Sequence, residues 1–77
     1  MILTCKVGTN RVRSVNVNPD DQIFTLMDKL GITDKKTVLI HKGSPFQLCT
    51  FMTFREAGIT YDTTVYISVP ALATFII

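Results

Sequence analysis

The spacing of hydrophobic residues separates one helical stretch from several strand-like ones. In residues 18–31 (NPDDQIFTLMDKLG), apolar side chains recur at i, i+3, i+4 and i+7 and form one stripe of Ile23, Leu26, Met27 and Leu30. Asp20 and Asp21 stand where a helix cap is wanted, and Gly31 can adopt the left-handed conformation that ends a helix. The pattern therefore predicts one helix, which at about ten residues is too short to be stable alone in water.

The other apolar stretches alternate with the period of two that is typical of strands. Strands are predicted over 1–7, 11–17, 37–42 and 63–69, with a short one at the start of 46–52. In the second stretch, Val12 is out of phase with Val15 and Val17, so either Val12 faces outward or a bulge resets the alternation. Gly43, Ser44 and Pro45 are expected to stop the third strand.

The segment 53–58 (TFREAG) is typical of a single capped helical turn. Thr53 can begin the turn, Glu56 follows three residues later as in a capping box, and Gly58 can end it. In the preceding loop, Phe51 and Met52 are expected to fill the core more readily than to form a surface.

These elements predict an α+β domain in two layers. One helix should cross one face of a mixed four- to five-stranded sheet, because a short amphipathic helix needs a sheet to cover. The first and last strands are expected side by side at the centre. A right-handed crossover through the helix predicts that the third strand is parallel to its neighbour. Residues 1–70 would form the domain, and residues 71–77 an apolar C-terminal tail.

Composition limits the classes of function. The chain has 77 residues, 47% of them hydrophobic and 18% charged, which favours one folded domain over long disorder. Its net charge is +2 and its basic residues are scattered, so no nucleic-acid partner is expected. No segment approaches the ~20 apolar residues of a membrane span, so no membrane association is expected. Cys5 and Cys49 match no metal or redox spacing, which favours the cytoplasm or nucleus.

Several core positions follow an order found in one known family. They are Met1, Lys6 and Val17 of the first hairpin with Asn18-Pro19-x-Asp21 after it, Leu39-Ile40 with Gly43, Thr53-Phe54-x-x-x-Gly58-Ile59, and Thr64-Val65-Tyr66-Ile67. This order resembles ubiquitin and its relatives, over most of residues 1–69. The resemblance implies a β-grasp fold and a role in the ubiquitin pathway.

The chain departs from that family at its C-terminus. Members that are conjugated to other proteins, and sulfur-carrier relatives, need a terminal glycine pair, whereas this chain ends in PALATFII and contains no Gly-Gly. A flexible glycine tail can enter an enzyme active site, and a β-branched end cannot imitate it. A covalent modifier is therefore not expected.

The resemblance also implies a partner-binding patch on the open side of the sheet. Carried over by position, the patch contains Ile40 on the third strand, Tyr66 and Ser68 on the last strand, and Lys42 at the end of the third strand. Tyrosine is a favoured interface residue. The alternative is an isolated surface isoleucine beside a surface tyrosine, which is normal in soluble proteins.

The tail provides a second candidate for partner binding. Phe75, Ile76 and Ile77 lack polar alternation, and exposing three such side chains to water costs on the order of 5 kcal/mol. The tail could dock on a partner or on another copy of the chain, which leaves self-association open. It could also fold back on its own domain or lead into a further segment of a larger protein.

No residue set predicts a reaction. His41, the sole histidine, has no cysteine or carboxylate at ligand or triad spacing and is expected to be a half-buried strand residue. We therefore expect no enzyme activity, no cofactor and no metal. The sequence predicts a non-conjugated ubiquitin-like module that binds a protein partner non-covalently. The alternative is a small structural subunit of a multi-protein assembly, docked through its apolar tail.

Overall fold

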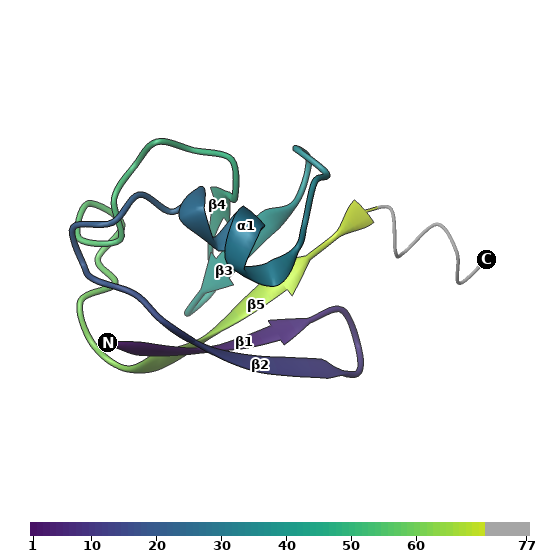
Figure 1. Cartoon of the computed structure of the whole chain (residues 1–77), viewed down its shortest axis with the longest axis horizontal. Helices are drawn as coiled ribbons and strands as arrows, with labels where there is room; N and C mark the ends of the chain where they lie inside the picture. Colours follow the sequence, from purple (N-terminus) through teal and green to yellow (C-terminus); the bar gives the residue numbers. More distant parts are fainter. Residues whose placement is uncertain (71–77) are drawn as a thin grey trace.

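The structure, a computed structural model, describes residues 1–70 and contains within them a five-stranded sheet and one short helix (Figure 1). The elements are β1 (Ile2–Val7), β2 (Arg11–Asn16), α1 (Thr25–Leu30), β3 (Val38–His41), β4 (Ser44–Gln47) and β5 (Thr63–Ser68). The predicted α+β class, with a mixed sheet and one helix, is confirmed. The tail 71–77, with its candidates Phe75, Ile76 and Ile77, lies outside the described residues.

The strands lie in the order β2-β1-β5-β3-β4. β1 and β5 are parallel neighbours at the centre, as predicted for the first and last strands. The prediction that the third strand is parallel to its neighbour is wrong, because β3 is antiparallel to both β5 and β4. After α1 the chain does not place β3 directly beside β1. It leaves room for one strand between them, and β5 occupies that position. β3 therefore runs in the direction of β2, a strand it does not contact.

The β1–β2 hairpin is regular along its whole length. Its register pairs Ile2 with Asn16 at one end and Val7 with Arg11 at the other, without a bulge. Val12 is 62% exposed, so the outward-facing alternative is the correct one for this residue.

Alternate residues of the strands and the apolar stripe of α1 form the core on one side of the sheet. The helix lies over that side (Figure 1). Its predicted stripe is confirmed, since Ile23, Leu26 and Leu30 are buried and Met27 is partly buried against them. The strands and loops add Leu3, Cys5, Val7, Val17, Leu39, Leu48, Phe54, Ile59, Val65 and Ile67 to the same buried cluster.

The helix begins later than predicted, at Thr25. Phe24 occupies the N-cap position without any side-chain hydrogen bond. The backbone N–H groups of Ile23 and Phe24 instead donate to the carbonyls of Met52 (2.8 Å) and Thr50 (3.2 Å). The first N–H groups of the helix itself, those of Thr25, Leu26 and Met27, donate to the carbonyls of Gln22, Ile23 and Phe24 at 3.1, 3.0 and 2.9 Å. Because backbone carbonyls accept from all of these groups, the helix needs no side-chain cap.

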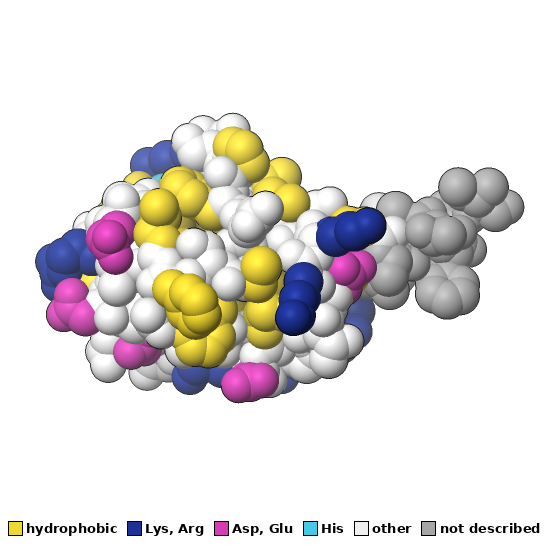
Figure 2. All heavy atoms as spheres, turned by 90° about the horizontal axis from the view of Figure 1, so that it is seen from above, with side chains coloured by type: hydrophobic (Ala, Val, Ile, Leu, Met, Phe, Trp, Pro, Cys, Tyr) yellow, Lys and Arg dark blue, Asp and Glu magenta, His cyan; other side chains and the backbone are white. Residues whose placement is uncertain are grey.

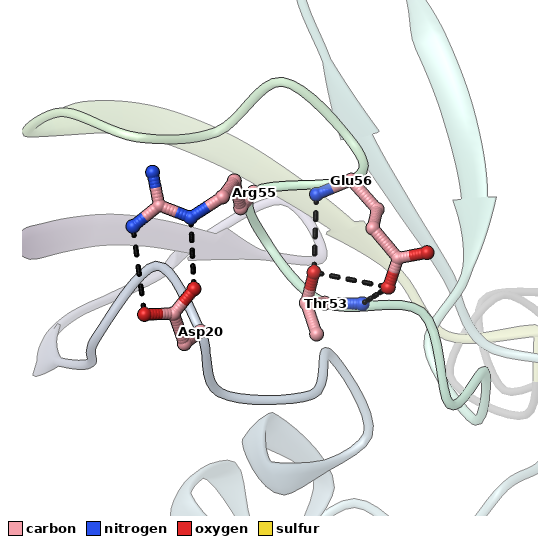
Figure 3. A network of polar contacts seen from close by, with 4 residues as sticks. All are labelled: Asp20, Thr53, Arg55 and Glu56. Carbon is pink, nitrogen blue, oxygen red and sulfur yellow. Dashed lines mark hydrogen bonds and ion pairs between the residues drawn. The ribbon is translucent and has the colours of Figure 1, made fainter.

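The two predicted cap carboxylates have other partners. Asp21 Oδ2 accepts a hydrogen bond from the backbone N–H of Asn18 at 3.0 Å. Asp20 pairs with Arg55, whose Nε lies 2.8 Å from its Oδ1 (Figure 3). The capping prediction for Asp20 and Asp21 is therefore wrong. The predicted end at Gly31 is right, since this residue has a φ of 68° and closes the helix.

The predicted turn over 53–58 is present. The backbone N–H of Thr53 donates to Glu56 Oε1, and the backbone N–H of Glu56 donates to Thr53 Oγ1, both at 3.1 Å (Figure 3). This reciprocal pair is the capping box that the spacing predicts. Phe54 and Ile59 are fully buried beside the turn.

The boundary between β3 and β4 differs from the prediction. The chain turns at Lys42 and Gly43, which have φ values of 50° and 84°, and β4 begins at once with Ser44 and Pro45. Proline is tolerated in β4 because this strand forms an edge of the sheet, where a missing N–H need not remove a ladder hydrogen bond.

Candidate functional site

The candidate site is the side of the sheet opposite α1, which we call the open face. In every strand its side chains alternate with those that point toward the side covered by α1. Among the strand residues that make up this face, Lys6 is the only charged one. The open face consists of Ile2, Thr4, Lys6, Val12, Ser14, Asn16, Val38, Ile40, Pro45, Gln47, Thr64, Tyr66 and Ser68.

One line of side chains crosses all the strands at the middle of the open face. Strand register places Ile40 directly opposite Tyr66 on one side and opposite Pro45 on the other. Lys6 lies opposite both Tyr66 and Val12. We call this line, Val12–Lys6–Tyr66–Ile40–Pro45, the cross-sheet row. Val12 and Tyr66 are 62% and 52% exposed, so the row has a largely accessible apolar surface.

Lys6 contributes a cation to the row, between Val12 and Tyr66. Its Nζ lies 5.5 Å from the centroid of the Tyr66 ring, a distance at which an ammonium group is attracted to an aromatic face. This contact holds the tyrosine ring and the positive charge together. The row can therefore offer both apolar area and a donor to a partner.

The structure brings together three of the predicted binding residues. Ile40 and Tyr66 are direct neighbours, and Ser68 lies on the same face, opposite Val38. Lys42 is placed elsewhere, in the turn after β3, with its Nζ 5.1 Å from the ring centroid of Tyr61. The left-handed backbone of Lys42 takes it out of the strand alternation.

Sequence reasoning missed Lys6, Val12 and Pro45 as members of the site. Lys6 could have been assigned to this face from strand alternation, since it is out of phase with the buried residues of β1. Val12 could not, because β2 contains no buried residue that marks its covered side. Nor could Pro45, because the sequence Gly43-Ser44-Pro45 predicts the end of a strand.

A hollow of about 520 Å³ opens beside the open face, at the end of β5. Its lining includes Lys6, Tyr66 and Ser68 from the open face and the β1–β2 turn at Thr9 and Asn10. Two predicted binding residues, Tyr66 and Ser68, thus border a concave surface that could receive a partner side chain.

His41 is buried at the edge of the core, with 7% of its surface exposed. Its Nε2 lies 3.4 Å from Thr63 Oγ1, and its ring packs edge-to-face on Tyr61 with centroids 6.0 Å apart. Burial, together with the charge of Lys42, lowers the pKa of His41 below its usual value. These contacts give this histidine a packing role in the strand.

Both cysteines are free. Burial raises the pKa of Cys5 to about 11, although the charge of Arg13 opposes this shift. The thiol of Cys5 is therefore protonated at neutral pH and unreactive. Cys49 is partly exposed, and its Sγ lies 3.4 Å from the carbonyl oxygen of Lys35.

A separate apolar surface lies at the start of α1. Phe24 and Phe51 pack edge-to-face with ring centroids 5.4 Å apart. Phe51 is 74% exposed and Met52 is 36% exposed, so the prediction that these two residues fill the core is wrong. Figure 2 looks down on the side where the segment after β4 runs and shows hydrophobic side chains in patches, with charged ones mostly toward the rim.

No group of three or more His, Cys, Asp and Glu residues within 1–70 is placed to hold a metal ion. None of the helices in that range is long and apolar enough to cross a membrane. No protein-family model matches the chain, and no curated protein sequence matches it. The strand order and the position of the helix are compatible with a β-grasp fold.

Proposed function

We propose that this chain is a non-conjugated ubiquitin-like module, without enzyme activity, that binds a protein partner through the open face. The observation that carries the proposal is the cross-sheet row, in which Ile40 and Tyr66 are direct neighbours near the centre of the open face. Protein interfaces are centred on such apolar and aromatic anchors with few charges among them.

The composition of the open face supports this choice over the other exposed surfaces. Lys6 is its single charged strand residue, whereas the one ion pair within residues 1–70, between Asp20 and Arg55, lies elsewhere on the surface. Low charge at the centre of a patch lowers the cost of removing it from water. The face is therefore suited to being covered.

The chemistry of the partner follows from the same residues. An apolar side chain would pack on Ile40 and Tyr66, or enter the hollow beside Tyr66 and Ser68. A carboxylate would meet the ammonium group of Lys6, whose own contact is with the tyrosine ring. We therefore expect an apolar anchor flanked by an acidic residue.

The free thiols favour a reducing compartment. We extend the proposal on this ground to the cytoplasm or nucleus, where the ubiquitin pathway operates. The alternative of an assembly subunit docked by its tail depends on residues 71–77 and stays a prediction from the sequence.

The test is a comparison of two charge insertions at exposed hydrophobic sites. Immobilised wild type, Ile40→Asp and Phe51→Asp are used to capture proteins from a cell extract. Phe51→Asp is the matched control, because Phe51 is exposed but lies in the loop before Thr53, away from the open face. We expect proteins that wild type and Phe51→Asp retain and that Ile40→Asp loses.

Thermal unfolding of each variant provides the control for folding. An aspartate at the half-buried position of Ile40 adds about 1 kcal/mol of unfavourable strand propensity to the loss of buried apolar area, so binding is compared only for variants that unfold cooperatively. Equal retention by folded wild type and folded Ile40→Asp would contradict the proposal.

A further inference from the structure

The outer edge of β2 has free backbone hydrogen-bonding groups. Met1 and Val17 exchange both backbone hydrogen bonds, at 2.8 and 2.9 Å. Because bonded and non-bonded pairs alternate in an antiparallel ladder, the pairs that bond β2 to β1 also include Leu3–Val15, Cys5–Arg13 and Val7–Arg11.

The intervening residues of β2, Val12, Ser14 and Asn16, therefore point their N–H and C=O groups away from the sheet. The Asn16 carbonyl accepts a hydrogen bond from Lys29 Nζ at 3.4 Å. Within residues 1–70, the outward groups of Val12 and Ser14 have no hydrogen-bond partner. They form a short template for an added strand.

The opposite edge of the sheet lacks this property. The bond from Leu48 N–H to the Thr37 carbonyl fixes the bonded pairs of β3 and β4, so Pro45 and Gln47 face outward. Pro45 has no N–H, which leaves Gln47 as the single outward donor of β4. Proline is a common means of blocking an edge. β2 has no proline and is the longer strand, with six residues against four.

The side chains beside the β2 edge are positively charged, which favours an acidic partner. Arg11 and Arg13 lie on the helix side of β2, two residues apart, and Lys29 reaches the same strand from α1. Within residues 1–70 none of these three forms an ion pair, since the one ion pair there joins Arg55 and Asp20. Pairing two β2 edges from two copies would bring like charges onto one face, which is destabilising.

We propose that the β2 edge binds an extended segment of a partner protein in which acidic and apolar residues alternate. Acidic side chains would lie opposite Arg11 and Arg13, and the apolar ones would lie beside Val12 on the other side of the added strand. Its backbone would pair with the outward groups of Val12 and Ser14. This surface is separate from Ile40 and goes beyond the function proposed above.

The test uses a synthetic peptide with the sequence Glu-Val-Glu-Val-Glu, blocked at both ends, titrated into the ¹⁵N-labelled chain. The amide signals of Val12 and Ser14 should shift, and their hydrogen exchange should slow, because both N–H groups acquire an acceptor. Arg13 and Val15 already donate to β1 and provide the internal control. Two control peptides, Glu-Glu-Val-Val-Glu and Lys-Val-Lys-Val-Lys, should bind weakly or not at all.

Ser14→Pro is the decisive variant. It removes an outward donor without removing a hydrogen bond of the β1–β2 ladder, so the hairpin should be retained. We expect peptide affinity to fall by roughly tenfold or more, because the added strand loses a main-chain bond and meets the proline ring. Ser14→Ala should bind within about twofold of wild type, since only the backbone of this residue is used.

A second variant keeps the test decisive if Ser14→Pro does not fold. In the double variant Arg11→Glu, Arg13→Glu, the acidic peptide should lose affinity and the lysine peptide should gain it. The Ile40→Asp variant should bind the acidic peptide as wild type does, which separates this proposal from the part of the open face around Ile40.

Three results would overturn the proposal. The first is peptide binding by folded Ser14→Pro at the affinity of wild type. The second is equal binding of the acidic and lysine peptides. The third is slowing of Val12 and Ser14 amide exchange with rising protein concentration and no peptide, which would identify a second copy of the chain as the occupant.

Discussion

The covered face and the open face are formed by the same strands, but different physical requirements determine which residues lie on each. On β3, Leu39 is fully buried under α1, whereas its neighbour Ile40 is half-buried on the open face. On β1, the same contrast holds between buried Cys5 and exposed Lys6. The covered face is determined by the need to exclude water. The open face is determined by strand register, which places distant residues beside one another.

This difference means that the two faces should respond differently to substitution. Residues of the covered face should change stability, and residues of the open face should change binding. The three predictions that follow test this separation, from the largest expected effect to the smallest.

Leu39→Ala and Ile40→Ala compare the two faces at adjacent positions of one strand. Leu39 has no exposed surface, so its truncation leaves a cavity and should lower the free energy of unfolding by about 3 kcal/mol. Ile40→Ala should cost about 1 kcal/mol, because the half-buried side chain loses less buried area. Urea unfolding of both variants measures the difference. Equal losses would show that α1 does not divide the sheet in this way.

Thr37→Val tests the covered face at a polar residue, because it replaces a buried hydroxyl with a methyl group. Thr37 is fully buried, and its Oγ1 has no hydrogen-bond partner. An unsatisfied buried hydroxyl is costly, so the valine variant should gain about 1 kcal/mol of stability. The same urea experiment measures this, with the exposed Thr64→Val as the control, for which we expect no comparable gain. A loss of stability in Thr37→Val would indicate that the hydroxyl is satisfied.

His41 gives the covered face a dependence on pH. Burial first, and the charge of Lys42 second, lower its pKa from 6.5. The folded chain therefore holds fewer protons at this site than the unfolded chain. Its contribution to stability is complete above pH 6.5 and is lost as the pH falls from there toward the lower folded pKa.

Urea unfolding between about pH 7.5 and 5.5, above the titration range of ordinary carboxylates, measures this effect. The free energy of unfolding should fall with falling pH in wild type and stay nearly constant in His41→Gln. An identical slope in both proteins would show that another group is responsible.

Much of the fold could be predicted from the sequence because burial leaves a periodic pattern. The stripe from Ile23 to Leu30 and the alternation in 63–69 both mark the covered face correctly. The start of the helix could not be predicted, because the two residues before it, Ile23 and Phe24, donate their N–H groups to the carbonyls of Met52 and Thr50, far along the chain. The prediction for the direction of β3 was wrong for a similar reason. The neighbour of β3 is β5, which comes later in the chain and takes the position beside β1.

The candidate site was predictable only in part. Ile40, Tyr66 and Ser68 lie on the face expected for them, because alternation within a strand assigns a side chain to a face. The neighbours Lys6 and Val12 were missed, since only the register between strands shows that they join the same row. Hydrophobicity alone does not predict burial in a loop. Nothing in the local sequence of Phe51 distinguishes an exposed aromatic residue from a buried one.

The central claim is that the open face binds the partner. Calorimetric titration of a captured, purified partner into wild type, Ile40→Asp and Phe51→Asp tests it most directly. We expect Ile40→Asp to lose at least about 2 kcal/mol of binding free energy, which is roughly thirtyfold in affinity. Phe51→Asp should bind as wild type does. Undiminished binding by folded Ile40→Asp, with loss in Phe51→Asp, would contradict the account and move the site to the loop beside α1.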